Sequence, residues 1–203
     1  MRTHLKPWLC LFAVLFTLLA PVCAHAQAKQ PDSIYLTQER SVRKTTYEKK
    51  KVFSRFLSLA EPIFTIPGLN QAMIPQGMAT GEDGTIYLSG YFKGSQASML
   101  VVVSADGQLR AQYSLQNPDG SAFTGHVGGL AIVESCLYLS AGAVDSSLYQ
   151  IARFPLTALV AEGAHMLRID DLLPVPVSPS FLSGGNGLLW IGNFYGSITF
   201  LMG

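Results

Sequence analysis

The chain has few cysteines and therefore no means of building a disulfide framework. Its 203 residues include three, Cys10, Cys23 and Cys136, and we expect the first two to be removed with an N-terminal leader. The one that remains, Cys136, cannot form an intrachain disulfide. Because Cys136 lies in an apolar, strand-like pattern, we interpret it as a small buried hydrophobic residue and not as a nucleophile.

The common catalytic signatures are also missing. The sequence contains no G-x-S-x-G, H-E-x-x-H, C-x-x-C or P-loop pattern, so the enzyme classes built on those motifs are excluded. A glycine-rich stretch, SGGNG at 183–187, has no helix behind it whose N-terminus could bind phosphate. We therefore assign no catalytic residue and no metal ligand, and no cofactor is evident.

A long apolar run occurs only near the N-terminus. Basic residues precede an apolar stretch over 8–19, and Ala24 and Ala26 follow it. This is the pattern of a secretory signal peptide, residues 1–26, cleaved after Ala26. The run is too short to span about 30 Å of hydrocarbon, and no later segment is a candidate transmembrane segment. We expect a secreted or periplasmic protein.

Charged residues are scarce and unevenly distributed. Residues 29–55 carry eight Lys/Arg against three Asp/Glu, whereas the chain beyond Arg55 carries four against ten. We therefore divide the exported chain into a basic arm, 27–60, and an acidic body, 61–203, which is long enough for one domain. The body lacks interleaved basic and aromatic residues, which argues against nucleic acid as a partner.

The arm favours a helix from about Leu36 to Leu59 that ends before Pro62. One face of this helix would carry an apolar stripe of Val52, Phe53, Phe56 and Leu57. Two interpretations remain open. The arm is either a surface for anionic lipid or an acidic partner, or a solvated segment packed against the edge or base of the body.

A sequence repeat of about 52 residues occurs three times in the body. Its copies begin with QGMA (76–79), GGLA (128–131) and PSFL (179–182), and continue with TIYLSG (85–90), CLYLSA (136–141) and LLWIGN (188–193). The third segment of each copy is SMLVVV (98–103), SLYQIA (147–152) or SITFLM (197–202). A fourth type of segment comes before the start of each copy: EPIFTI (61–66), LRAQYSL (109–115) and HMLRID (165–170). Tyr87, Tyr138 and Trp190 share one position, 51 and 52 residues apart.

These pieces predict four antiparallel strands per unit, because each is short, rich in β-branched and aromatic residues and bounded by turn signals. Glycine in EDG (82–84) and ADG (105–107) suits tight hairpins. Repeated four-stranded units of this length are typical of β-propeller blades. The innermost strands carry the small residues Gly77, Ala79, Gly128, Gly129, Ala131 and Ser180. A β-sandwich with coincidental spacing is the alternative.

The blade phrases DGTIYLSG, VSADGQL and NGLLWIGNF resemble those of secreted propellers of the NHL, YVTN and SMP-30-like families. The resemblance covers the chain from about Glu61 onward. It implies a propeller fold and a binding face at one end of the blades. SMP-30-like lactonases hold a divalent metal with Glu, Asn and Asp near the axis, but the matching inner strands here carry no carboxylate, and Gln76 is the one polar candidate nearby.

The blade count predicts an all-β fold that is a partial propeller, with about two full blades, an incomplete third and an N-terminal helical arm. An open ring leaves apolar blade faces and strand edges uncovered. We therefore expect a truncated product of a longer protein, with possible self-association through open blade edges. Two alternatives are a pair of chains that close one ring and a fragment without function.

Ligands of propellers bind at the loops that join strands two and three and successive blades. The polar residues of those loops are the candidate binding residues: Tyr91, Asp119, His126, Asp145, Asn193 and Tyr195. For His126 a loop-bracing role, and for Asp119 a turn-forming role, compete with ligand contact. We expect an exported binding or scaffold domain without catalysis, whose partner is a small molecule or a protein. The alternative is a metal-dependent propeller hydrolase of the lactonase type.

The signal-peptide interpretation makes a direct prediction. The chain recovered from the exported fraction of a secreting host should begin at Gln27, because Ala24 and Ala26 provide the small side chains that signal peptidase requires. Intact-mass measurement and N-terminal sequencing check this. A chain that keeps Met1 and remains in the cytoplasm would contradict it.

Overall fold

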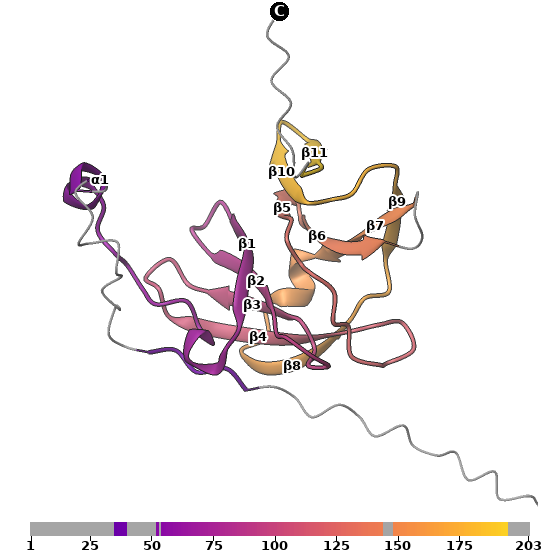
Figure 1. The fold of residues 1–203 in the computed structure, drawn as a ribbon, viewed down its shortest axis with the longest axis horizontal. Coiled ribbons are helices and arrows are strands. Elements are labelled where there is room, and N and C mark those ends of the chain that lie inside the picture. Colours follow the sequence, from indigo (N-terminus) through magenta and orange to yellow (C-terminus); the bar gives the residue numbers. More distant parts are fainter. Residues whose placement is uncertain (1–34, 40–51, 53, 144–147, 195–203) are drawn as a thin grey trace, which may run out of the picture. The chain divides into compact units, whose positions relative to one another are not determined.

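The computed structural model describes residues 35–39, 52, 54–143 and 148–194. The predicted signal peptide, most of the basic arm and the expected strand at 197–202 lie outside these ranges. Within them the chain is mostly β, as the sequence predicts, and eleven strands form three sheets, none of which is closed (Figure 1). No helix of the described residues is long and apolar enough to cross a membrane.

Sheet A begins with a four-stranded antiparallel meander that matches the first predicted unit. Its strands are β1 (Ile74–Thr80), β2 (Ile86–Tyr91), β3 (Met99–Val103) and β4 (Leu109–Gln116). The two predicted hairpin turns are confirmed, since Gly84 and Gly107 have φ of 80° and 84°, a conformation that glycine adopts without strain. All five side chains of β3 are buried, which is expected for a central strand with both faces covered.

Sheets B and C contain the second and third units. Sheet B consists of β5 (Leu130–Val133), β6 (Cys136–Ala143), β7 (Tyr149–Pro155) and β9 (Leu172–Val175), all antiparallel. Sheet C is the hairpin of β10 (Phe181–Gly185) and β11 (Leu188–Gly192). Cys136 is half-buried at the start of β6, not fully buried as its apolar surroundings suggested.

One strand does not lie where the repeat predicts it. Residues 165–170 were expected to complete the second unit, but β8 (Gly163–Arg168) pairs in parallel with β4 of sheet A, and β9 takes the fourth place in sheet B (Figure 1). The 3₁₀ helix η4 (Leu156–Leu159) redirects the chain, and its Leu159 is buried in the core. The detour covers the edge of β4, which would otherwise expose unpaired backbone groups.

The expected strand at 61–66 is also wrong, because these residues belong to no strand. Pro62 lies within the segment and Pro67 follows it, and both lack the N–H group that a sheet ladder needs. Phe64 and Ile66 instead pack their side chains onto one face of sheet A.

The sheets pack face to face, and alternate residues of each strand face opposite neighbours. Tyr87, Leu100 and Val102 of sheet A meet Leu130, Leu137 and Leu139 of sheet B in the main core. On the other side of sheet B, Ala131, Ile151 and Val175 meet Leu182 of sheet C. The remaining face of sheet A carries Leu88, Met99, Val101 and Val103, which pack with Met73, Phe92 and Leu36.

Residues 35–39, which we call the strap, cover that remaining face of sheet A. They have no helical structure, so the predicted helix is wrong at its start, and α1 (Ser54–Leu59) is the helix described within the arm. Leu36 is fully buried. The buried amide of Gln112 accepts a hydrogen bond from Leu36 N–H at 2.5 Å and donates one to Leu36 C=O at 3.3 Å. A local helix is disfavoured because the body offers the strap both an apolar pocket and backbone partners.

A second glutamine of the body, Gln71, also holds the strap. Its side chain accepts a hydrogen bond from Thr37 N–H at 2.6 Å and donates one to Tyr35 C=O at 2.7 Å. In the described part of the predicted apolar stripe, Val52 and Phe56 are 78% and 66% exposed, so neither is covered by the body. The strap therefore supports the packed-arm interpretation for residues 35–39 alone.

The buried position of Leu36 predicts a large loss of stability on truncation. Leu36→Ala should lower the free energy of unfolding by about 2–5 kcal/mol, because it removes a buried side chain and leaves a cavity. Tyr35→Ala, at a neighbouring side chain that is 67% exposed, is the control and should change it by about 0.5 kcal/mol or less. Urea denaturation measures both. Equal effects would show that Leu36 does not anchor the strap.

Candidate functional site

A cleft lies at the loop end of the three sheets, where β1, β5 and β10 begin and β2 and β6 end. Its volume is about 260 Å³, and it is lined by Gln76, His126, Gly128, Ser140, Gly142, Ser178, Pro179 and Ser180. We call it the loop-end cleft. Its lining comes from β1, from β6 and from the segments that lead into β5 and β10, so each unit of the repeat contributes to it.

His126 provides the ionisable side chain of this lining. Its ring is exposed and lies against the ring of Tyr91, with centroids 4.2 Å apart and planes tilted by 42°. Tyr91 ends β2, whereas His126 lies in the segment that leads into β5. The contact therefore joins the first unit to the second at the mouth of the cleft and leaves the imidazole nitrogens open to a ligand.

Two serines hold the lead-in segments in place, and they occupy the same position in successive units. Ser89 donates a hydrogen bond to Val127 C=O at 2.7 Å, next to His126. Ser140, 51 residues later, donates one to Pro179 C=O, next to Ser180. Both serines are buried. The two bonds thus attach the start of one sheet to the end of the second strand of the sheet before it.

Glycine at two equivalent positions allows this close approach. A Cβ at Gly77 would lie 2.7 Å from Ser89 Oγ and 2.9 Å from Leu130 Cβ. A Cβ at Gly129 would lie 2.5 Å from Ser140 Oγ and 2.9 Å from the backbone nitrogen of Leu182. Any side chain at these two positions would therefore push adjacent sheets apart and open the cleft.

The third unit contributes amide and hydroxyl groups. Ser180, which lines the cleft, donates a hydrogen bond to Asn193 Oδ1 at 3.3 Å. Asn193 is half-buried just beyond β11. Of the six predicted binding residues, the structure thus places His126 in the lining and brings Tyr91 and Asn193 into contact with lining residues.

Asp119 lies apart from this group and does not line the cleft. It sits in the turn after β4, where its carboxylate accepts hydrogen bonds from Ser121 O–H at 2.6 Å and Ser121 N–H at 2.9 Å. These two bonds lower the pKa of Asp119 below its usual value. Its contacts are those of a turn former. Asp145 and Tyr195 lie outside the described residues.

The six binding residues predicted from the sequence did not include Ser140, Ser178, Pro179 or Ser180. A signal for them existed, because the repeat aligns Ser140 with Ser89 and aligns the start of the third unit with Gln76 and Gly128. The pattern identified the strands, but it did not indicate that the serine hydroxyls would point at the next sheet.

A wider hollow lies at the opposite, hairpin end of the sheets. Its volume is about 830 Å³, and acidic residues Glu82, Asp83 and Glu134 are among those that line it. Burial and, to a lesser degree, the charge of Asp83 raise the pKa of Tyr87, whose ring also faces this hollow. Hydrogen bonds from Thr85 N–H and O–H lower the pKa of Asp83. Among the described residues no group of three or more His, Cys, Asp or Glu side chains is arranged to hold a metal ion.

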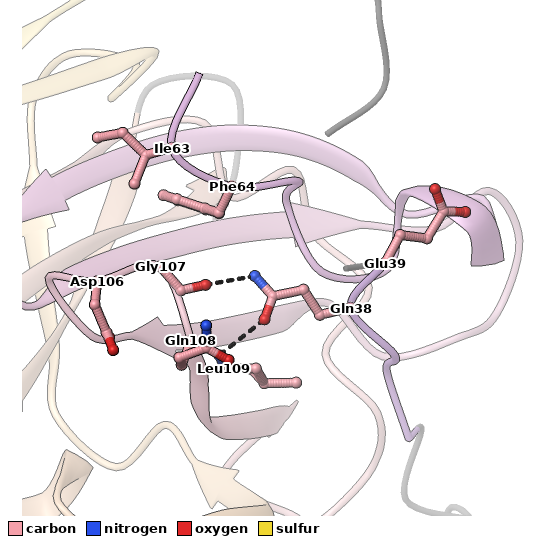
Figure 2. A pocket seen from close by; sticks show the side chains of 8 residues that line it. All are labelled: Gln38, Glu39, Ile63, Phe64, Asp106, Gly107, Gln108 and Leu109. Atoms are coloured by element: carbon pink, nitrogen blue, oxygen red, sulfur yellow. Dashed lines mark hydrogen bonds between the residues drawn. The ribbon is translucent and has the colours of Figure 1, made fainter. Parts of the chain in front are cut away.

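A third hollow, of about 510 Å³, lies between the strap and the β3–β4 hairpin (Figure 2). Gln38 extends into it, donates a hydrogen bond to Gly107 C=O at 2.7 Å and accepts one from Leu109 N–H at 2.9 Å. A further bond runs from its Nε2 to Thr65 C=O at 3.2 Å. These bonds use both ends of the Gln38 amide, so the C-terminal part of the strap is held at this hollow.

Comparison with known proteins returned no similar protein: no protein-family model, no curated protein and no solved structure matches this chain.

The paired serines predict matched losses of stability. Ser89→Ala and Ser140→Ala should each lower the free energy of unfolding by about 1–3 kcal/mol, because each leaves a buried carbonyl without its donor. Ser95→Ala, at an exposed serine of the loop after β2, is the control and should change it by about 0.5 kcal/mol or less. Thermal and urea denaturation compare the three variants. If either buried-serine variant lost no more unfolding free energy than the control, the two contacts would not be equivalent.

Proposed function

We propose that this chain is an exported domain of β-propeller type that binds a small polar ligand, or a polar side chain of a protein partner, in the loop-end cleft without catalysing a reaction. The observation that carries the proposal is the convergence of His126, Gln76 and Ser180, one from each unit, on a single cleft. Pockets of this kind fix a ligand with a few polar groups placed on a rigid scaffold.

The repeated contacts between sheets support the propeller part of this proposal. The Ser89–Val127 bond recurs, one unit later, as the Ser140–Pro179 bond. Tyr87 packs against the second unit, and Tyr138 packs against the third. Successive propeller blades contact one another through equivalent residues, so the same contact recurs from each blade to the next.

The chemistry of the cleft indicates the class of ligand. The residues that line it offer one imidazole, one carboxamide, the hydroxyls of Ser178 and Ser180 and backbone groups, and they include no carboxylate, lysine or arginine. A lining of polar groups without acidic residues, lysine or arginine suits a polar molecule without a strong net charge. The volume of about 260 Å³ is below the range of roughly 300–1,000 Å³ for drug-sized ligands, so the bound group is small.

The competing proposal is a metal-dependent hydrolase of the lactonase type. That chemistry places hard oxygen ligands, chiefly carboxylates, around a divalent cation. The lining of the loop-end cleft provides His126 and Gln76 but no carboxylate, which favours binding over hydrolysis at this cleft.

Binding at the cleft is tested by thermal-shift and NMR screening of the exported protein against free amino acids, dipeptides and monosaccharides. For a compound that binds, His126→Ala and Gln76→Ala should each weaken the affinity by about tenfold, the scale of one lost hydrogen bond. The matched control is His165→Ala, since His165 also lies against a tyrosine ring, that of Tyr113, but away from the cleft.

A parallel titration with Ca²⁺ and Zn²⁺, followed by a lactone hydrolysis assay, addresses the competing proposal. Metal binding together with turnover that His126→Ala abolishes would overturn the binding-only function. Equal ligand affinities in the His126 and His165 variants would show that the ligand binds outside the loop-end cleft.

A further inference from the structure

The outer face of sheet C is apolar and uncovered by any described residue. Phe181 and Leu188 are each 55% exposed and Trp190 is 62% exposed. The register places Phe181 opposite Gly192, Trp190 opposite Ser183 and Leu188 opposite Gly185, so all three side chains lie on one side of the hairpin. We call this side the outer face. The other side, with Leu182, Leu189 and Ile191, packs on sheet B.

Phe181 is held on the outer face by its cross-strand partner. A Cβ at Gly192 would lie 1.7 Å from Cζ of the Phe181 ring, so the ring lies directly on the Gly192 backbone. An aromatic ring over a cross-strand glycine is a stabilising pair within a sheet. The outer face is therefore ordered by sheet C itself, and Phe194, 78% exposed, follows it closely in the chain.

The corresponding faces of the other two sheets are covered. Tyr87 and Tyr138 align with Trp190 in the repeat, and Tyr87 is only 8% exposed beneath sheet B while Tyr138 packs against sheet C. The outer face thus carries the type of residue that the repeat places in a contact between sheets. Contiguous exposed apolar surface of this kind marks an interaction site.

Sheet A, at the opposite end of the three sheets, limits how a second copy can contact the outer face. The face of sheet A that points away from sheet B would be the contact surface in a head-to-tail arrangement, but Leu36, Phe64 and Ile66 cover it. Head-to-tail stacking of copies would have to displace that buried leucine. A two-fold contact requires no displacement, because each copy presents the same outer face to the other.

We propose that the outer face of sheet C is a self-association surface, through which two copies form a closed, two-fold symmetric dimer centred on Trp190.

The exposed area fits a weak dimer. A large aromatic side chain has roughly 150–250 Å² of surface, so the exposed parts of Phe181, Leu188 and Trp190 amount to on the order of 350 Å² per copy. Two copies would bury about 700 Å² in all, which is below the size of a standard specific interface and is expected of a weak, reversible one.

Sedimentation velocity of the chain purified from the exported fraction of a secreting host tests this proposal. The protein should be a dimer at concentrations on the order of 100 µM and dissociate on dilution toward 1 µM, as expected for an interface of this size. Trp8 lies in the predicted signal peptide, so Trp190 should be the sole tryptophan of the exported chain, and its emission should shift to shorter wavelength as the dimer forms.

Trp190→Lys and Leu188→Lys should each raise the dissociation constant by about tenfold or more, because each places a charge at the centre of the contact. Both positions face solvent in the isolated chain, so far-UV circular dichroism and the melting temperature of the monomer should not change. Ile63→Lys is the matched control at another exposed apolar residue, 66% exposed, and should leave the dimer intact.

Three outcomes would overturn the proposal. If the protein were a monomer over the whole concentration range, the outer face would not be a self-association surface. A dimer that both lysine variants preserve would place the contact elsewhere. A series of species larger than a dimer would indicate an open, head-to-tail contact in place of a two-fold one.

Discussion

The close approach of each inner strand to the sheet that follows is the constraint on which this structure depends. At Gly77 and Gly129 the neighbouring sheet lies within 3 Å of where a side chain would begin. At Ser89 and Ser140 a buried hydroxyl bonds the segment that leads into that sheet. Because the same glycine–serine pair recurs one unit later, the second contact repeats the first. The loop-end cleft exists because these bonded lead-in segments converge beside it.

The two ends of the stack are completed differently. At sheet A the strap fills the exposed face with Leu36 and satisfies its own backbone through Gln112 and Gln71, while β8 covers the edge of β4. At sheet C the described residues leave Phe181, Leu188 and Trp190 facing solvent. Among the described residues the first unit is therefore capped and the outer face of sheet C is not, whereas the terminal unit of a repeat array needs a polar outer surface to remain soluble. This asymmetry is the basis of the proposed self-association at sheet C.

Much of the local structure could be predicted from the sequence, because it depends on local chemistry. Alternating apolar residues and glycine turns located nearly every strand, and the repeat identified Tyr87 and Tyr138 as equivalent contacts. Three features could not be found in this way. The course of β8 depends on a long-range choice between two sheet edges, which a pattern does not encode. The strap at Leu36 favours a helix locally, but a distant buried amide, Gln112, offsets that preference. At the cleft, loop composition indicated Tyr91, His126 and Asn193, whereas Asp119 formed a turn and the bracing role of Ser140 depended on tertiary contacts.

The equivalence of successive contacts between sheets can be measured directly by NMR. In a nuclear Overhauser spectrum of the isotope-labelled protein, the Hα protons of Gly77 should give cross-peaks to the side chain of Leu130. Those of Gly129 should give cross-peaks to the side chain of Leu182, at similar intensity, because both glycines meet the next inner strand in the same way. A folded protein that shows one set without the other, or Gly129 in contact with a different strand, would contradict the repeated packing on which this account depends.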